Sequence, residues 1–255
     1  MHRAFFILAA MMTVRPVSLS LPLASIRVGQ PETFGGDAAT EPPGRLWVSS
    51  IRKAEITGPV WLDTLNLAGD AQADQKNHGG LDQSLCVYPG VHYHHWAERL
   101  GRPLPPGSFG ENLTLAGEWR EQDVCLGDVF SFGEAVVQIS QPRSPCYKLG
   151  RRWQLPLLPK WLQDSGRTGW YMRVLQPGLV APTDTLELTE RLYSEWPLTL
   201  VNSVKYERRE ELAVVHALAE CPALGEFWRR KMRGRLLGDM PLYDDANRLE
   251  GPANR

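Results

Sequence analysis

Several protein classes are excluded by what the sequence lacks. None of its four cysteines forms a CxxC pair, so zinc-ribbon and dithiol-redox sites have no support. Neither charge dominates, because 28 Lys and Arg residues face 29 Asp and Glu residues. A polyanion-binding chain carries a basic excess instead. We therefore expect no nucleic acid polymer as a partner, and scattered thiols of this kind suit a cytoplasmic protein.

Long apolar runs are also missing. No stretch approaches the roughly 20 apolar residues that span a bilayer, so no membrane partner is expected. The short run at residues 4–12 resembles a signal peptide. The sequence Val14-Arg15-Pro16 after it is a poor cleavage context, which favours an upstream start codon as the origin of this run.

What the chain does have is many short apolar runs separated by Gly and by 20 Pro residues. Alternating or β-branched segments predict strands at residues 45–57, 60–62, 84–88, 111–115, 123–132, 134–140, 168–175 and 183–189. The first two of these predict a hairpin. This succession of short strands separated by turns is typical of a mainly β fold, a closed or nearly closed β-barrel.

Helical spacing is confined to a few segments. Residues 91–100 and 158–164 predict helices that cap the barrel, and residues 208–219 and 223–237 predict a small C-terminal helical appendage. The expected organisation is an N-terminal segment at 1–44, a barrel domain at 45–196 and a helical extension at 197–255.

Three polar segments stand out between the strands. In residues 69–82, Gly79 and Gly80 let backbone amides approach a ligand, while His78 and Asp82 can handle a proton. A tight turn with a hydrogen-bonded histidine explains the same letters. In residues 109–114, Glu111 and Asn112 can bond the edge of a polar heterocycle, but this segment alone favours a strand-start turn with an exposed acid.

The third segment, residues 138–149, presents Cys146 from a stiff loop. Pro142 and Pro145 restrict the backbone before the thiol. Arg143 and Lys148 flank it, and nearby cations lower a thiol pKa from about 8.5. A thiolate is the form that acts as a nucleophile or as a ligand to a soft metal.

Together the segments at 69–82, 109–114 and 140–149 resemble the signature of the MOSC domain family, named for the C-terminal domain of molybdenum cofactor sulfurase. The similarity runs from about residue 45 to 192, and the helices after Pro197 resemble the three-helix extension of the YiiM-like branch. Three motifs in the right order are far more specific than one. Gln83 is a departure, because the family pattern usually has Lys or Arg there, at an expected phosphate contact.

The resemblance implies a MOSC-type barrel that holds a molybdenum-pterin cofactor, with Cys146 as the metal ligand. It implies a reductase of N-hydroxylated compounds, including hydroxylaminopurines. His78 and Asp82 are the candidates for proton delivery. The candidates for cofactor binding are Lys76, Gly79, Gly80, Glu111, Asn112, Gln141, Arg143, Ser144, Lys148 and Arg173.

Electrons must come from elsewhere, because the chain has no GxGxxG and no clustered cysteines for an iron-sulfur centre. We therefore expect an external flavin or iron-sulfur reductase as a partner. Two other functions stay open. Cys146 with His78 as its base could form a thiol hydrolase, or Cys146 could carry sulfur as a persulfide or deliver the cofactor without turnover.

Three further histidines and two further cysteines are expected to have structural roles. His92, His94 and His95 are expected on a surface helix rather than at a metal. Cys86 and Cys125, within apolar strands, are expected to be buried and inert.

Overall fold

The barrel is built from short strands, as the sequence predicts. The computed structural model describes residues 19–35, 46–206, 211–238 and 243–251, without the side chains of residues 76, 77 and 243–246. Its strands are β1 (Ser20–Val28), β2 (Glu32–Phe34), β3 (Trp47–Ser49), β4 (Ala54–Glu55), β5 (Val60–Leu62), β6 (Leu85–Pro89), β7 (Leu113–Leu115), β8 (Val129–Phe132), β9 (Ala135–Pro142), β10 (Trp170–Gln176), β11 (Gly178–Val180) and β12 (Thr185–Glu190).

The main sheet closes on itself. Its order is β12-β8-β9-β10-β6-β7-β1, and β12 pairs again with β1 through Leu21 and Leu186. All neighbouring pairs in this ring are antiparallel except β6 and β7, which are parallel. The expected closed β-barrel is thereby confirmed.

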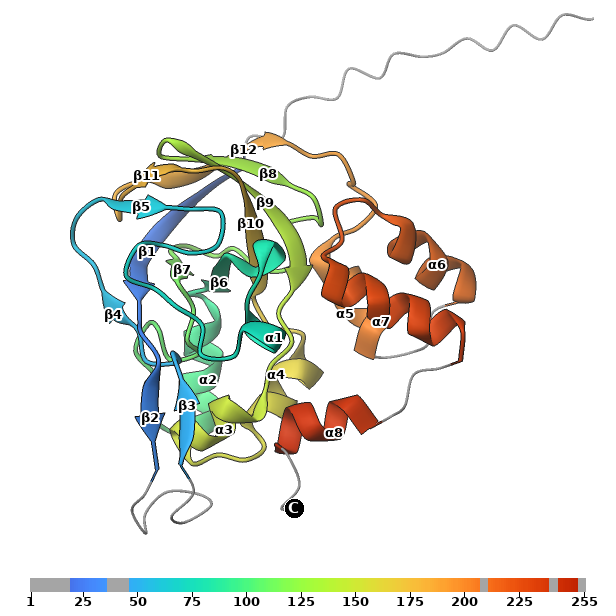
Figure 1. The fold of residues 1–255 in the computed structure, drawn as a ribbon, viewed down its shortest axis with the longest axis horizontal. Helices are drawn as coiled ribbons and strands as arrows, with labels where there is room; N and C mark the ends of the chain where they lie inside the picture. The colour runs from blue at the N-terminus through green and yellow to red at the C-terminus, as the bar shows by residue number, and fades with distance from the viewer. Residues whose placement is uncertain (1–18, 36–45, 207–210, 239–242, 252–255) are drawn as a thin grey trace, which may run out of the picture.

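Helices cover one end and one side of the barrel (Figure 1). α2, α3 and α4 lie at the lower end, and α5, α6 and α7 pack beside β9 with α8 below them. The helical elements are α1 (Gln75–His78), the 3-10 turn η1 (Leu81–Gln83), α2 (His92–Leu100), α3 (Tyr147–Trp153), α4 (Leu158–Ser165), α5 (Leu198–Tyr206), α6 (Leu212–Glu220), α7 (Glu226–Leu236) and α8 (Tyr243–Glu250).

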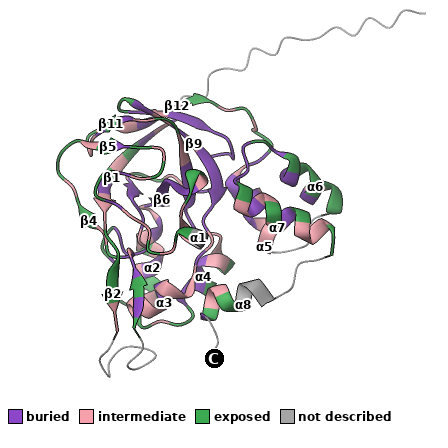
Figure 2. Cartoon of the chain, in the orientation of Figure 1, coloured by how far each residue is buried: buried purple, intermediate pink, exposed green. Residues whose placement is uncertain are grey.

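Alternation along β9 explains how the barrel and the C-terminal helices meet. Ala135, Val137 and Ile139 are buried in the barrel, and the residues between them are half-buried. After Ile139 the alternation ends and Ser140 and Gln141 are buried too, because the C-terminal helices cover the outer side of the strand at this point (Figure 2). The site described below lies where β9 leaves this covered stretch.

The strands predicted for the first part of the chain differ from the structure in two places. β1 belongs to the closed sheet, so the barrel includes residues before 45. The predicted hairpin is wrong, because β4 pairs with β1 and β5 pairs with β11. The apolar run at 4–12 lies outside the described residues. Among those that are described, no helix combines the length and the apolar character that a membrane crossing requires.

Candidate functional site at Cys146

Two adjoining pockets meet at Cys146. The first, of about 610 Å³, is enclosed by the loops at residues 49–53, 70–74 and 109–112 and by the exit of β9. The second, of about 820 Å³, lies between that exit and helices α7 and α8. The residues that line both are Asp74, His78, Gln83, Cys146, Lys148 and Tyr171.

The thiol of Cys146 is the most activated sulfur in the described chain. Cys146 lies directly before α3 in extended conformation and is half-buried. Burial alone raises the pKa of this thiol. The facing and hydrogen-bonded His78 imidazole, the backbone N–H of Lys148 and the Arg143 guanidinium outweigh burial and lower the pKa from 9.0 to about 7. Much of this sulfur is therefore thiolate at neutral pH.

The other three thiols behave in the opposite way. Burial raises the pKa of Cys86 and of Cys221 above 9.0. Burial and the nearby Asp128 carboxylate raise the pKa of Cys125 to about 11. All three side chains are buried, as expected for Cys86 and Cys125, although Cys86 also lines the first pocket. Only Cys146 combines a lowered pKa with access to both pockets.

Two predicted cations lie beside the thiol. Arg143 is 8% exposed, lines the first pocket and donates to the carbonyl of Phe109. Burial disfavours its charge, but the facing Cys86, Tyr171 and Cys146 side chains raise its pKa further above the usual arginine value. Lys148 lines both pockets. Each can therefore place a positive charge next to an anionic ligand.

Buried polar side chains that hydrogen-bond one another form one wall of the first pocket. The Asp70 carboxylate accepts hydrogen bonds from the Gly29 N–H at 2.8 Å and from Asn112 Nδ2 at 2.9 Å, and it pairs with Lys53. Asn112 Oδ1 accepts from the Cys86 N–H at 3.1 Å. Lys53 could not be identified from the sequence, because its partner Asp70 lies 17 residues away and no local pattern indicates the pair.

Ser50 offers an independent indication that the first pocket takes a polar ligand. Its hydroxyl oxygen is buried, lines this pocket and has no hydrogen-bond partner among the described residues. A buried hydroxyl without a partner costs about 1–3 kcal/mol, so a ligand that bonds it is favoured. A thiolate, two cations and an unpaired hydroxyl together fit a phosphate-bearing group with a soft metal.

Glu111 does not line either pocket, contrary to its predicted role in cofactor binding. It is fully buried, and its carboxylate accepts from the Gly107 N–H at 2.7 Å, the Phe109 N–H at 3.1 Å and Thr114 Oγ1 at 3.0 Å. Tyr93 donates to it as well. These bonds satisfy the carboxylate within the protein, so Glu111 fixes the loop that carries Asn112.

Asp82 and Arg173 are also placed away from the predicted roles. The Asp82 carboxylate pairs with Arg173 at 2.8 Å and accepts from the Glu226 N–H, at the start of α7, at 2.8 Å. Arg173 donates in addition to the carbonyl of Ala223 at 2.9 Å. Neither residue lines a pocket. The pair joins the barrel to the C-terminal helices, because its partners belong to the segment before and at α7.

The remaining predicted residues differ in whether they line a pocket and in which one. Gln141 and Ser144 line only the second pocket. Gly79 and Gly80 line neither, and Gly80 has a φ of 94°, the left-handed turn that glycine favours. They direct the chain out of α1 after His78. The side chain of Lys76 lies outside the described residues. Gln83, at the position of an expected phosphate contact, lines both pockets.

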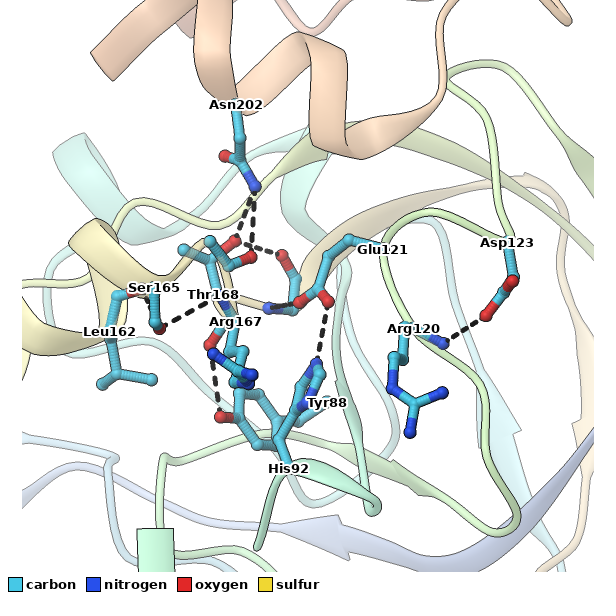
Figure 3. A network of polar contacts seen from close by, with 12 residues as sticks. Tyr88, His92, Arg120, Glu121, Asp123, Leu162, Ser165, Arg167, Thr168 and Asn202 are labelled. Atoms are coloured by element: carbon cyan, nitrogen blue, oxygen red, sulfur yellow. Dashed lines mark hydrogen bonds and ion pairs between the residues drawn. The ribbon is translucent and has the colours of Figure 1, made fainter. Parts of the chain in front are cut away.

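The histidines of α2 were predicted on a surface helix, and this is wrong for His92. Figure 3 shows His92 Nε2 bonded to Glu121 at 2.8 Å, while the other Glu121 oxygen accepts from the Gly169 N–H at 2.8 Å. His92 and Glu121 are both buried. Asn202 of α5 donates to Thr168 Oγ1 at 3.2 Å in the same region. The described residues contain no cluster of three or more His, Cys, Asp or Glu suited to a metal.

The sequence matches known protein families and known relatives. Residues 74–187 match the MOSC domain, and residues 196–238 match the family described as YiiM-like, 3-alpha helix domain. YflK of Bacillus subtilis is 41% identical over 216 residues, which cover 84% of this chain and 95% of that protein. A Gibberella moniliformis protein named Reductase is 36% identical over 182 residues, which cover 69% of this chain and 31% of that protein.

A solved structure agrees in fold as well as in sequence. The crystal structure of YiiM from Geobacillus stearothermophilus superimposes with a TM-score of 0.70 at 38% identity, and the match covers 85% of this chain and 99% of that one. The chain belongs to the MOSC domain family, in the YiiM-like branch in which a 3-alpha helix domain follows the barrel.

Proposed function

We propose that this protein binds a molybdenum-pterin cofactor in the first pocket and reduces N-hydroxylated compounds that enter the second. The observation that carries the proposal is the Cys146 thiol, whose pKa is lowered to about 7 at the junction of the two pockets. Membership of the MOSC family and the similarity to a protein named Reductase support a redox role.

The first pocket offers ligands for each part of such a cofactor. Cys146 would supply a thiolate to the metal, since soft metals prefer thiolate ligands. Arg143 and Lys148 would hold its phosphate through charge-assisted hydrogen bonds. Ser50 would meet the polar edge of the pterin, and Asn112 holds the pocket wall through its bonds to Cys86, Arg27 and Asp70. When bound, the cofactor would supply the electrons and the oxygen affinity that cleavage of an N–O bond requires.

The chain's own residues would orient the substrate and deliver protons. Reduction of R–NHOH to R–NH2 and water takes up two electrons and two protons and breaks the N–O bond. His78 lines both pockets beside Cys146, so its imidazole can donate one of these protons to the departing oxygen. The second proton would come from solvent through the open side of the second pocket.

The electrons would come from a partner protein. The sequence has no dinucleotide-binding GxGxxG and no cysteine cluster for an iron-sulfur centre. An external flavin or iron-sulfur reductase is therefore part of the proposal.

Metal analysis tests the proposal directly. Protein expressed with active cofactor synthesis should contain about one molybdenum per chain, and Cys146→Ser should lose most of it, because a hydroxyl is a poor substitute for a soft thiolate. Cys125→Ser is the matched control, since the Cys125 sulfur donates only to the Ser194 carbonyl at 3.8 Å. Loaded protein with a chemical reductant should convert an N-hydroxylamine to its amine. Equal molybdenum in the Cys146 and Cys125 variants would contradict the proposal.

A thiol hydrolase is the second candidate, because His78 faces and hydrogen-bonds the Cys146 sulfur as a general base would. The expected oxyanion donors are not supported, since Gly79 and Gly80 line neither pocket. Turnover of acyl substrates by molybdenum-free protein, stopped by alkylation of Cys146, would favour the hydrolase over the reductase.

A further inference from the structure

The C-terminal helices complete the second pocket. Phe227 comes from α7, and Asn247 and Arg248 come from α8, while the opposite wall is formed by the exit of β9 and by Cys146. The Arg248 guanidinium is tied to the Pro145 carbonyl and to Gln163. This ties α8 to the loop that carries the thiol. The barrel alone would leave the reacting sulfur open on this side.

Gln141 lines this pocket, and its amide oxygen is unsatisfied. Its side chain is 2% exposed and lines only the second pocket, and its Oε1 is buried with no hydrogen-bond partner among the described residues. Oε1 faces the α-carbon of Gly225, where an added Cβ would lie 2.4 Å from it. Because Oε1 is buried and faces Gly225, Nε2 is the end of the amide left to meet a bound molecule.

The other lining groups favour a planar ring. Tyr147, Tyr171 and Phe227 bring three aromatic side chains to the pocket, and aromatic rings stack on flat ligands. An amide donor that faces a pocket selects a ligand that carries a matching acceptor, since an analogue without one leaves the donor unpaired.

We propose that Gln141 is the specificity-determining residue of the second pocket and that it donates from Nε2 to a ring nitrogen of a heteroaromatic N-hydroxylamine. The inference rests on the proposed function and adds to it the part of the molecule that selects the substrate. Gly225 leaves room for the Gln141 amide, and its φ of −59° is one that alanine adopts freely. A methyl group at this position therefore displaces the amide without straining the backbone.

Two substrates that share the N-hydroxylamine group distinguish an effect on substrate selection from an effect on the chemical step. Hydroxylaminopurine carries ring nitrogens that accept hydrogen bonds, whereas phenylhydroxylamine carries none. With loaded full-length protein and a chemical reductant, Gln141→Leu should lower kcat/KM for hydroxylaminopurine by about tenfold or more. The loss for phenylhydroxylamine should be smaller, because this substrate offers no ring acceptor to the Gln141 amide. Gln176→Leu, an exposed glutamine at the end of β10, is the matched control and should change neither.

Gly225→Ala provides the second variant. It should lower use of hydroxylaminopurine in the native background and have a smaller effect in a Gln141→Ala background, because the added methyl then has no amide to displace and the Asp82 Cβ lies 3.3 Å from it. An equal loss on both substrates, or no loss on hydroxylaminopurine, would overturn the inference.

Binding of adenine to cofactor-free protein gives a readout that does not depend on turnover. Titration calorimetry should show that Gln141→Leu weakens adenine binding by about tenfold. If native protein reduces neither substrate, the proposed function fails while this measurement still decides the role of Gln141. Unchanged adenine affinity in Gln141→Leu would then reject it.

Discussion

At the scale of single residues, His78 is the main favourable influence on the Cys146 thiol. Its charge and its hydrogen bond oppose burial and, with Lys148 and Arg143, bring the pKa to about 7. We predict that His78→Gln raises this pKa toward 9. At pH 7 about half of the native thiols are ionised, against a few per cent for an unperturbed thiol. The rate of iodoacetamide labelling of cofactor-free protein, followed against pH, measures the change.

Labelling at neutral pH reports this one thiol, because the pKa values of Cys86, Cys125 and Cys221 are all raised. His94→Gln is the matched control, since His94 is exposed on α2. A labelling profile that keeps its midpoint near pH 7 in His78→Gln would show that the Lys148 N–H and the Arg143 charge ionise the sulfur without His78.

The position of a site residue could be predicted where a motif itself presents the side chain. The stiff, basic loop around Cys146 predicted an accessible thiolate, and the structure brings His78, Arg143 and Lys148 to it. Asp82 and Glu111 could not be assigned in this way. Asp82 bonds a backbone N–H 144 residues later in the chain, and the bonds to Glu111 depend on how its loop folds back. A local sequence pattern therefore predicts neither the Asp82 hydrogen bond nor those of Glu111.

At the scale of elements, Asp82 acts as a cap supplied to α7 by a distant loop. The carboxylate accepts from the Glu226 N–H in the first turn and holds Arg173. We predict that Asp82→Ala lowers the free energy of unfolding by about 1 kcal/mol, the usual cost of a lost cap, because the partly exposed ion pair adds little. Urea denaturation measures this loss, and hydrogen exchange should be faster in the first turn of α7.

Asp82→Asn is the matched variant, since its amide oxygen can still accept from the Glu226 N–H. It should retain most of the stability that Asp82→Ala loses. If Asp82 delivered a proton instead, both variants would shift the acid limb of the pH profile of turnover. A structural Asp82 leaves that limb in place.

Elements with clear periodicity were predicted, and elements formed by tertiary context were not. The segments predicted at 134–140 and 223–237 correspond to β9 and α7. The helix α5 was missed, because Leu198-Thr199-Leu200-Val201 has the β-branched, apolar character of a strand. The helix α3 was missed as well, because Pro142 and Pro145 predict an extended loop and give no sign that a helix starts directly after Cys146.

At the scale of the whole molecule, the barrel shares one hydrophobic core with the helices α5, α6 and α7. The same buried cluster contains Val137 and Ile139 of β9, Val201 of α5, Leu218 of α6 and Met232 of α7. The buried Asn202 and Thr168 side chains add a polar contact between α5 and the barrel (Figure 3). Two parts that bury apolar surface against each other to this extent are expected to unfold together.

Leu218→Ala tests this cooperativity. Leu218 is fully buried in α6, so its truncation should cost about 2–5 kcal/mol. If the core is shared, the slowest-exchanging amides of β9 lose the same protection as those of α6, because both exchange only through global unfolding. Leu212→Ala is the matched control in the same helix, where the side chain is 62% exposed, and it should leave both sets unchanged. Hydrogen exchange that is faster in α6 while β9 keeps its native protection would mean that the helical unit opens by itself, and the second pocket with it.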